Sequence, residues 1–536
     1  MERGADDPAP FKVGEPEPEA GERGDGGVGR SAASGMVWMT AQKWDVRLSG
    51  LATVAVLTRV LDPTDFGLVA AASTIIPLVL LLSDLGFSTY IVQAEDPDER
   101  VLSTGFWFSV SAGLTLCVGL VVIAPLLGVL FRLPAVVPVL RVMVLSIVFV
   151  ALGSVPTALL RRRMAFRTLA VQATVAAVVA QVAAVTLTLA GAGVWALVAQ
   201  LVTAQGIGCV MAWGAARWRP RRHFARGEFV EMARFGSKVV GVELVALSRS
   251  WGETAIIAGS LGASGLGYLN IAQRLIGVTQ DLSAVALVPV STVAFAQIRK
   301  SPQRLRAAYL RALGISYAAV APMMTYVAVS AGLLVPLLFG SGWGPSVVVT
   351  QALAVAGILT LGAMLDHGLF YGTGQPGQWF LYALAVDVLT VATTAFAVRF
   401  GLIGIAVGFI GVSALATIAR WVLVGRLVGT GWLLVARPFG SVAICTVGSA
   451  VAGLATMHVL AAAPAVLTLA VTGFAVVGVH VALVRLVMPG VLQDVLALLP
   501  RPSWGLFDRV AARRRVAVVT FRDEDEMTMT QREGTA

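Results

Sequence analysis

The chain has 536 residues, of which 57% are hydrophobic and 13% are charged, and its formal net charge is +10. Soluble domains carry about 25% charged residues, so this composition excludes an ordinary soluble protein. The positive charge does not indicate a nucleic-acid partner, because no basic stripe interleaved with aromatic residues accompanies it. Basic segments that face anionic lipid head groups explain the charge better, and membrane lipids are therefore an expected partner.

Both ends of the chain differ from its apolar middle. Residues 1–34 are rich in Gly, Pro, Glu and Asp and are expected to form a disordered cytoplasmic tail. A signal peptide would begin basic and then turn apolar, which this segment does not do. Residues 491–536 are expected to form a second cytoplasmic tail, with a basic patch at Arg513-Arg514-Arg515.

The middle of the chain consists of consecutive apolar runs. Each run approaches the ~20 residues that a helix needs to cross the hydrocarbon core of a bilayer, so the sequence predicts an all-α polytopic membrane protein with about 14 transmembrane helices. The expected spans are 36–58, 67–92, 104–130, 135–159, 168–190, 194–216, 236–260, 267–296, 313–338, 346–373, 378–398, 402–424, 437–458 and 464–487.

The connections between the expected spans alternate in charge. Arginine is concentrated in three of them, 161–167, 217–234 and 299–311. Connections between these, such as 191–194 and 339–345, carry no Lys or Arg. Because basic loops stay on the cytoplasmic side during insertion, this pattern predicts a multi-pass protein of the cell membrane with both termini in the cytoplasm.

The sequence also contains an internal repeat. The segment LDPTDFGL at 61–68 recurs as LGASGLGY at 261–268, which is an offset of 200 residues, and 125–145 resembles 335–355. Six spans in each half give a parallel repeat, and transporters of this plan hold their substrate between the halves. The expected units are an N-terminal six-helix lobe at 35–216, a basic cytoplasmic linker at 217–235, a C-terminal six-helix lobe at 236–424, and two additional transmembrane helices at 425–490.

Basic residues lie inside several expected spans, where a charge costs at least ~2.5–3.5 kcal/mol and is retained when it faces a cavity or a partner. At ~1.5 Å per residue, Arg47 lies roughly 16 Å into the first span and Arg249 about 20 Å into the seventh. With Lys43 and Arg274, they are predicted to line a central cavity that binds an anionic head group. The alternative is local ion pairing, such as that of Arg249 with Glu253 at i, i+4.

Acidic residues within the spans fall into two groups. Candidates for binding a coupling ion, H+ or Na+, are Glu243, Glu253 and Asp387. Candidates for a gate close to the inner face are Asp84, Asp281 and Asp366. Arg420 is also expected close to the inner face. The alternative for these four residues is that their charged ends snorkel to the membrane interface.

Nothing in the sequence indicates an enzyme. The outer connections are too short to hold a folded active site, and no phosphate-binding loop with its lysine is present. The three cysteines and four histidines show no spacing typical of metal ligands, so we expect neither a metal nor a cofactor.

Several segments of the chain resemble those of a known family. The run LTRVLDPTDFGLVAAAS at 57–73, followed by LSDLGFSTYIVQ at 82–93, resembles the opening of polysaccharide transport family flippases. These belong to the multidrug/oligosaccharidyl-lipid/polysaccharide exporter (MOP) superfamily. Residues 235–275 resemble the start of the second lobe of these proteins, and LLFGSGWGPS at 337–346 matches one of their turns.

The resemblance implies an alternating-access cavity between two lobes. It implies export of an undecaprenyl-pyrophosphate-linked oligosaccharide or a related lipid-borne precursor for lipopolysaccharide or exopolysaccharide biosynthesis. Ion coupling is implied for some members, and a polysaccharide polymerase machinery is a further expected partner. The chain departs from the family's pattern at Trp251 and Glu253, where an Asn/Asp pair is expected, so the coupling residue stays open. The alternatives are an ion-coupled multidrug antiporter and a membrane-embedded glycan polymerase or ligase.

Overall fold

The computed structural model describes residues 42, 44–94, 97–284, 295–491 and 493. Within these residues the secondary structure is helical and contains no strand, which confirms the predicted all-α fold. Eleven helical segments there are long and apolar enough to cross a membrane, so the count of about 14 is not confirmed. The predicted tail at 1–34 and nearly all of that at 491–536 lie outside the described residues.

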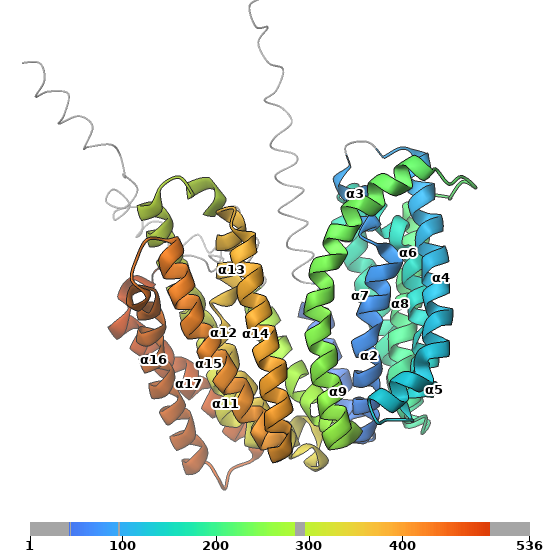
Figure 1. Ribbon diagram of the computed structural model, residues 1–536. Coiled ribbons are helices and arrows are strands. Elements are labelled where there is room, and N and C mark those ends of the chain that lie inside the picture. The colour runs from blue at the N-terminus through green and yellow to red at the C-terminus, as the bar shows by residue number, and fades with distance from the viewer. Residues whose placement is uncertain (1–41, 43, 95–96, 285–294, 492, 494–536) are drawn as a thin grey trace, which may run out of the picture.

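The helices gather into two bundles that stand side by side (Figure 1). The first bundle begins with a helical segment at residues 44–57. Its other helices are α2 (Pro63–Asp84), α3 (Phe87–Gln93), α4 (Glu99–Leu130), α5 (Val136–Met143), α6 (Leu145–Arg162), α7 (Phe166–Leu189) and α8 (Val194–Ala216).

The second bundle contains the later part of the chain (Figure 1). Its elements are α11 (Pro302–Phe339), η1 (Ser341–Trp343), α12 (Ser346–Thr360), α13 (Ala363–Gly372), α14 (Pro376–Ala397), η2 (Val398–Phe400), α15 (Gly401–Leu427), α16 (Trp432–Val459) and α17 (Ala465–Val487).

A long helix, α9 (Arg226–Ala284), connects the two bundles. It packs against α2 of the first bundle and against α12 and α14 of the second. Gly262 divides it, with a φ of 70° and a ψ of −172° that a residue with a side chain rarely adopts. The helix begins within the segment 217–235 that was expected to be a linker, and its two parts correspond to the seventh and eighth expected spans.

Local signals explain where several helices start and stop. Asp98 caps α4, because its Oδ1 accepts hydrogen bonds from the backbone N–H groups of Arg100 and Val101. Proline occupies the first turn of α2, α11 and α14, where its missing N–H has no helical partner to lose. Two expected spans are broken: 67–92 stops at Leu85, and 346–373 is interrupted between α12 and α13.

The two bundles meet where α2 crosses the second part of α9. A Cβ atom on Gly67 would lie 1.7 Å from the carbonyl oxygen of Ala263, and one on Gly267 would lie 1.9 Å from that of Pro63. Positions 67 and 267, like 63 and 263, differ by the repeat offset of 200. The repeated segments therefore make the same close contact twice with exchanged roles, which only glycine permits.

Trp343 packs over this crossing and is 1% exposed. Its indole Nε1 donates a 3.0 Å hydrogen bond to the carbonyl oxygen of Thr58. The rings of Phe66 and Tyr268, one from each copy of the repeat, approach its ring edge-on with centroids 5.2 and 6.0 Å away. Side chains from both halves thus join the bundles at this end.

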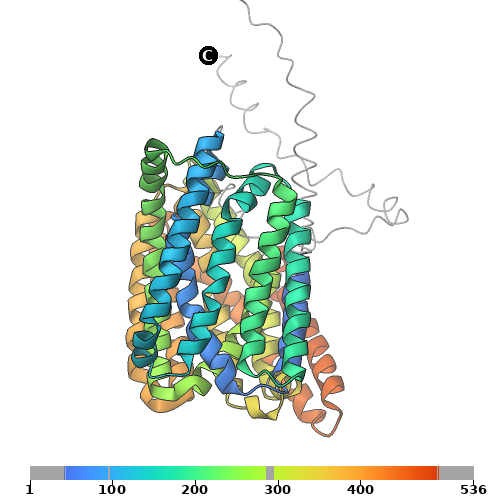
Figure 2. The same ribbon diagram turned by 90° about the vertical axis from the view of Figure 1, so that its right-hand side faces the viewer.

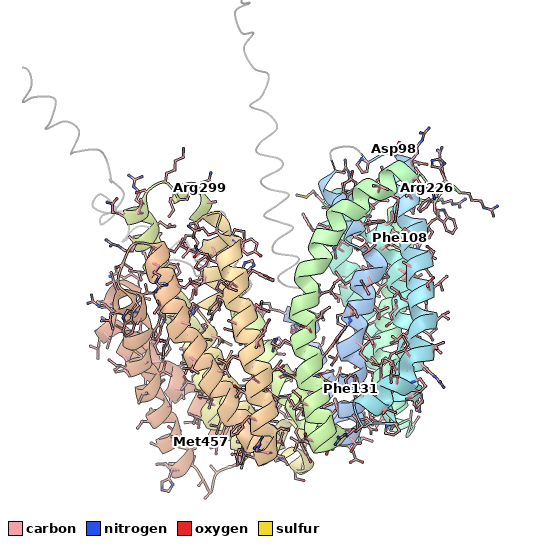
Figure 3. The ribbon with its side chains drawn as sticks, in the orientation of Figure 1. Asp98, Phe108, Phe131, Arg226, Arg299 and Met457 are labelled. Atoms are coloured by element: carbon pink, nitrogen blue, oxygen red, sulfur yellow. The ribbon has the colours of Figure 1, made fainter. Side chains whose placement is uncertain are left out.

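The basic connections lie at the opposite end of the molecule. Figure 3 shows Arg226 and Arg299 at one end and Phe131 and Met457 at the other. We call the former the arginine-rich end. The view in Figure 2 shows that the helices of the first bundle run along the length between these two ends.

Candidate functional site

A first cavity, of about 510 Å³, lies between α9 and the helices α12, α14 and α15. Charged and polar side chains make up a large part of its wall. The polar and aromatic residues that line it are Arg249, Glu253, Gln273, Gln280, Thr360, Trp379, Tyr382, Asp387, Thr390, Phe409 and Ser413.

Three charged side chains in the first cavity contact one another. Arg249 Nη1 lies 3.1 Å from Glu253 Oε2 on the same helix, and Arg249 Nε lies 2.9 Å from Asp387 Oδ1 on α14. The i, i+4 ion pair is therefore formed, with Asp387 as a second partner. Glu253 Oε1 is buried and makes no hydrogen bond to the described residues. One guanidinium thus faces two carboxylates, which leaves an oxygen available for a proton or a cation.

The Arg249–Asp387 pair forms where α9 and α14 approach closely. A Cβ atom on Gly252, three residues further along α9, would lie 3.2 Å from Val391 Cγ1, four residues further along α14. From this region the ribbons of α9 and α14 diverge toward the arginine-rich end (Figure 1). The ion pair therefore connects α9 to α14 of the second bundle, near the point where these two helices begin to diverge.

A second cavity, of about 350 Å³, lies between the helical segment 44–57, α8 and the second part of α9. It shares Gln273 and Gly277 with the first cavity, so the two adjoin across α9. Arg47 and Arg274 both line it, close enough for their charges to repel.

Arg274 has a neutral partner in this cavity, since its Nε donates a 3.0 Å hydrogen bond to Asn270 Oδ1. Among the described residues no carboxylate forms an ion pair with Arg274. Gln200 and Gln273 add amide groups to the wall. Two cations with amide neighbours form a suitable environment for a phosphate group.

The remaining candidates lie elsewhere. Lys43 lies outside the described residues, as do the side chains of Glu243 and Asp281 in α9. Asp84 lies at the end of α2 and lines a different cavity inside the first bundle. Asp366 lies inside the second bundle. The structure thus brings together Arg249, Glu253 and Asp387 in one place, and Arg47 and Arg274 in the adjoining one.

Asp366 and Arg420 form a buried ion pair, with Arg420 Nη1 2.8 Å from Asp366 Oδ2. Arg420 Nη2 donates to the hydroxyl oxygen of Tyr317 at 3.0 Å, and the Tyr309 hydroxyl donates to Asp366 Oδ1. The two charged side chains are 1% and 0% exposed. Snorkelling to the interface is therefore wrong for both of them.

The physical reason is the interruption between α12 and α13. A Cβ atom at Gly362 would lie 2.1 Å from Arg420 Nη1, so the missing side chain makes room for the guanidinium. The carbonyl oxygen of Leu359, at the end of α12, accepts a 2.9 Å hydrogen bond from Thr417 Oγ1. Polar side chains from α15 thus satisfy backbone groups that a broken membrane helix leaves without partners.

Two helical bundles with charged, adjoining cavities where they meet define a membrane transporter. The fold matches that of lipid II flippase MurJ in an inward closed conformation, with a TM-score of 0.70, 12% identity, and coverage of 86% of this chain and 100% of the other. It also matches an inward-facing multidrug resistance MATE family transporter of the MOP superfamily, with a TM-score of 0.57 and 18% identity over 72% of this chain and 96% of the other.

The sequence identifies the family. Residues 56–348 match the model described as polysaccharide biosynthesis protein, and the chain belongs to this family. It is 29% identical over 345 residues to the succinoglycan biosynthesis transport protein ExoT of Rhizobium meliloti (strain 1021), covering 64% of this chain and 70% of that protein. It is 24% identical over 407 residues to the lipopolysaccharide biosynthesis protein WzxC of Escherichia coli (strain K12), covering 74% and 82%.

Proposed function

We propose that this chain is a flippase that moves a lipid-linked oligosaccharide or polysaccharide precursor across the cell membrane by alternating access. The carrier we propose is a polyprenyl pyrophosphate such as undecaprenyl pyrophosphate. Family membership and the names of the relatives support transport of a polysaccharide precursor. The likeness in fold supports two bundles that move relative to each other around a central site.

The observation that carries the proposal is the second cavity. Arg47 and Arg274 place two positive charges inside the bilayer region, where such charges are retained for a function or a partner. Arginine pairs well with phosphate, because its planar fork matches two oxygens of the anion. A pyrophosphate would bind between these two side chains, its sugars would follow a polar path, and its polyprenyl chain would stay in the lipid.

The charges of the first cavity suit a different task. Arg249 is already paired with Glu253 and Asp387, so it is a weaker candidate for an anion than Arg274. We assign Glu253 and Asp387 to ion coupling, because binding of H+ or Na+ by these carboxylates would weaken their ion pairs with Arg249. Because Asp387 belongs to α14 and Arg249 to α9, such binding would change the contact between the two bundles.

The test is reconstitution of the full chain in proteoliposomes with a fluorescent polyprenyl-pyrophosphate-linked oligosaccharide. We expect the label to move between leaflets, and an Arg274→Gln variant to lose most of this movement. Arg399→Gln is the control, since Arg399 is an exposed cation that packs over the ring of Phe396. Equal movement in liposomes with and without the protein would overturn the proposal.

One observation favours a second candidate, an ion-coupled antiporter for cationic drugs. The two carboxylates of the first cavity would also attract a cationic substrate. An outward proton or sodium gradient that drives uptake of a cationic dye, in vesicles that do not move the lipid-linked glycan, would establish this alternative.

A further inference from the structure

A third cavity, of about 450 Å³, lies inside the first bundle. It is lined by residues of α2, α3, α4, α6, α7 and α8, and it shares no lining residue with the first two cavities. Its wall is unusually polar for the interior of a membrane bundle. The polar residues that line it are Ser83, Asp84, Ser88, Thr89, Ser109, Ser154, Thr157, Arg161, Gln172 and Gln205.

The third cavity lies at the arginine-rich end. Asp84 is the last residue of α2, Arg161 is the last but one of α6, and Gln172 lies in the second turn of α7. The helices here are otherwise rich in Ala, Val and Leu. Lipid surrounds a membrane bundle, and polar groups inside it cost several kcal/mol unless they have partners, so this wall is suited to a polar occupant.

Two groups in the wall lack partners. Ser109 is 1% exposed, and its Oγ makes no hydrogen bond to the described residues. Gln172 Nε2 donates to the carbonyl oxygen of Gly208 at 2.7 Å, whereas its Oε1 is buried without a donor. Buried polar groups nearly always have a hydrogen-bond partner, and the described residues supply none to these two atoms. Both residues line the third cavity, so a hydrogen-bonding occupant would suit them.

The charges of the wall offset each other. Asp84 Oδ1 accepts a 2.6 Å hydrogen bond from Ser88 Oγ, and Arg161 lies near enough for its charge to act on the Asp84 carboxylate. Phosphate is disfavoured, because Asp84 would repel it and one arginine faces the cavity. A lone cation is disfavoured as well, because Arg161 would repel it and the space is far larger than an ion needs.

The hydrogen-bonding groups instead fit a molecule with many hydroxyls. The hydroxyls of Ser83 and Ser154, two lining residues, donate to backbone carbonyls three residues earlier, so their oxygens can still accept a hydrogen bond. Carboxylate and amide oxygens accept as well, and Arg161 donates. The ring of Phe149 adds an apolar surface. One aromatic ring, with acceptors and donors in the same wall, suits the apolar faces and polar edges of a pyranose.

We propose that the third cavity binds uncharged sugar units, one or two at a time. Two sources offer this chemistry. One is the sugar portion of the lipid-linked glycan, which rests on the proposed function, and the other is a free oligosaccharide from the solution at the arginine-rich end. In either case the sugar site is separate from the second cavity, where Arg47 and Arg274 would bind pyrophosphate.

A native cysteine makes the test direct. Cys209 lines the third cavity, and the other two cysteines, Cys117 and Cys445, lie elsewhere. A full-length C117S/C445S variant in nanodiscs therefore carries one reporter thiol. The measurement is the rate at which a small, water-soluble methanethiosulfonate modifies Cys209. The probes are lipid-linked oligosaccharide extracted from the host membrane, the same oligosaccharide freed by mild acid, and inorganic pyrophosphate.

We expect oligosaccharide at ten times its Kd to slow modification about tenfold, and pyrophosphate to leave it unchanged. Protection by the freed oligosaccharide supports a site that takes sugar from either source. Protection by the lipid-linked form alone restricts the source to the carrier lipid. Absence of protection by both forms, or equal protection by pyrophosphate, overturns the proposal. If the protein moves the glycan in proteoliposomes but sugar does not protect Cys209, the sugar site is rejected and the flippase function stands. If sugar protects Cys209 but the glycan does not move, the flippase function is rejected and the sugar site stands.

A second measurement covers the case of an unreactive thiol. Ser109→Ala removes a hydroxyl that makes no bond within the described residues, so it should leave thermal stability unchanged. It should weaken binding of fluorescent freed oligosaccharide about three- to tenfold, the effect of one lost hydrogen bond. Ser111→Ala is the matched control, because Ser111 lies on the same helix with its hydroxyl bonded to Phe108 O and exposed. Equal binding by both variants and the parent would contradict the proposal.

Discussion

Gly67 and Gly267 hold exchanged positions in a single helix crossing, each facing the backbone carbonyl of a residue four positions before the other. A two-fold relationship of this kind follows when two copies of one segment pack against each other. The two copies of the sequence repeat thus pack directly against each other, and this contact lies at the end away from the basic connections. This crossing is where we expect the bundles to pivot.

The first prediction concerns this crossing. Gly67→Ala should destabilise the protein and open the crossing, because the new methyl group would lie 1.7 Å from a carbonyl oxygen unless the helices move apart. Thermal unfolding in detergent measures the stability. Gly119→Ala is the matched control, since a Cβ there meets nothing within 4 Å. A Gly67→Ala protein as stable as the control would show that the crossing is not closely packed.

The second prediction concerns the buried pair of Asp366 and Arg420. Asp366→Asn should cost about 3–5 kcal/mol of unfolding free energy, because it leaves the guanidinium buried without its counter-charge. The double variant D366L/R420M should recover much of that loss, since it removes both charges. Denaturant unfolding in mixed micelles measures both quantities. Additive losses in the double variant would argue against coupling of the two side chains.

The third prediction concerns Arg249 and Asp387. Asp387→Asn should weaken the contact between α9 and α14, because the 2.9 Å ion pair joins these two helices. The readout is disulfide formation between Gly252→Cys and Val391→Cys, because a Cβ atom at position 252 would lie 4.0 Å from Val391 Cβ. We expect slower cross-linking in the Asn variant and an intermediate rate with Asp387→Glu. An unchanged rate would mean that the ion pair does not hold the helices together.

The fourth prediction concerns orientation. In a cysteine-free background, Ser301→Cys should react with a membrane-impermeant maleimide from the cytoplasmic side, and Gly342→Cys from the outside. The reason is that Ser301 belongs to an arginine-rich connection and Gly342 to a neutral one. Right-side-out and inverted vesicles distinguish the two sides. The reverse labelling pattern would overturn the predicted topology.

The sequence predicts the helical fold well because each span carries its own signal. The predicted span 194–216 coincides with α8. Breaks within spans are harder to predict: α12 and α13 are separated at Leu361 and Gly362 by packing against Arg420, which lies far along the chain. Apolar length alone contains no sign of such a distant contact.

The candidate site is predictable in part for the same reason. Charges inside apolar runs are visible in the sequence, so Arg249 and Asp387 can be selected as individual residues. Their pairing joins positions 138 residues apart (387 minus 249), which no local pattern encodes. The third cavity is harder still, since Ser109 and Gln172 look like ordinary small or polar members of membrane helices. It exists because six helices leave a space between them.

The crossing of α2 and α9 differs in physical character from the arginine-rich end. Glycine-to-backbone approaches, the edges of aromatic rings and hydrogen bonds to carbonyls hold it together, and no ion pair among the described residues contributes there. Dissolved salt would screen the charges of the arginine-rich end but would have little effect on the crossing of α2 and α9. Bilayer thickness and lateral pressure would act on the crossing instead. Ionic strength would therefore affect opening of the molecule at the arginine-rich end, and lipid composition would affect opening at the crossing.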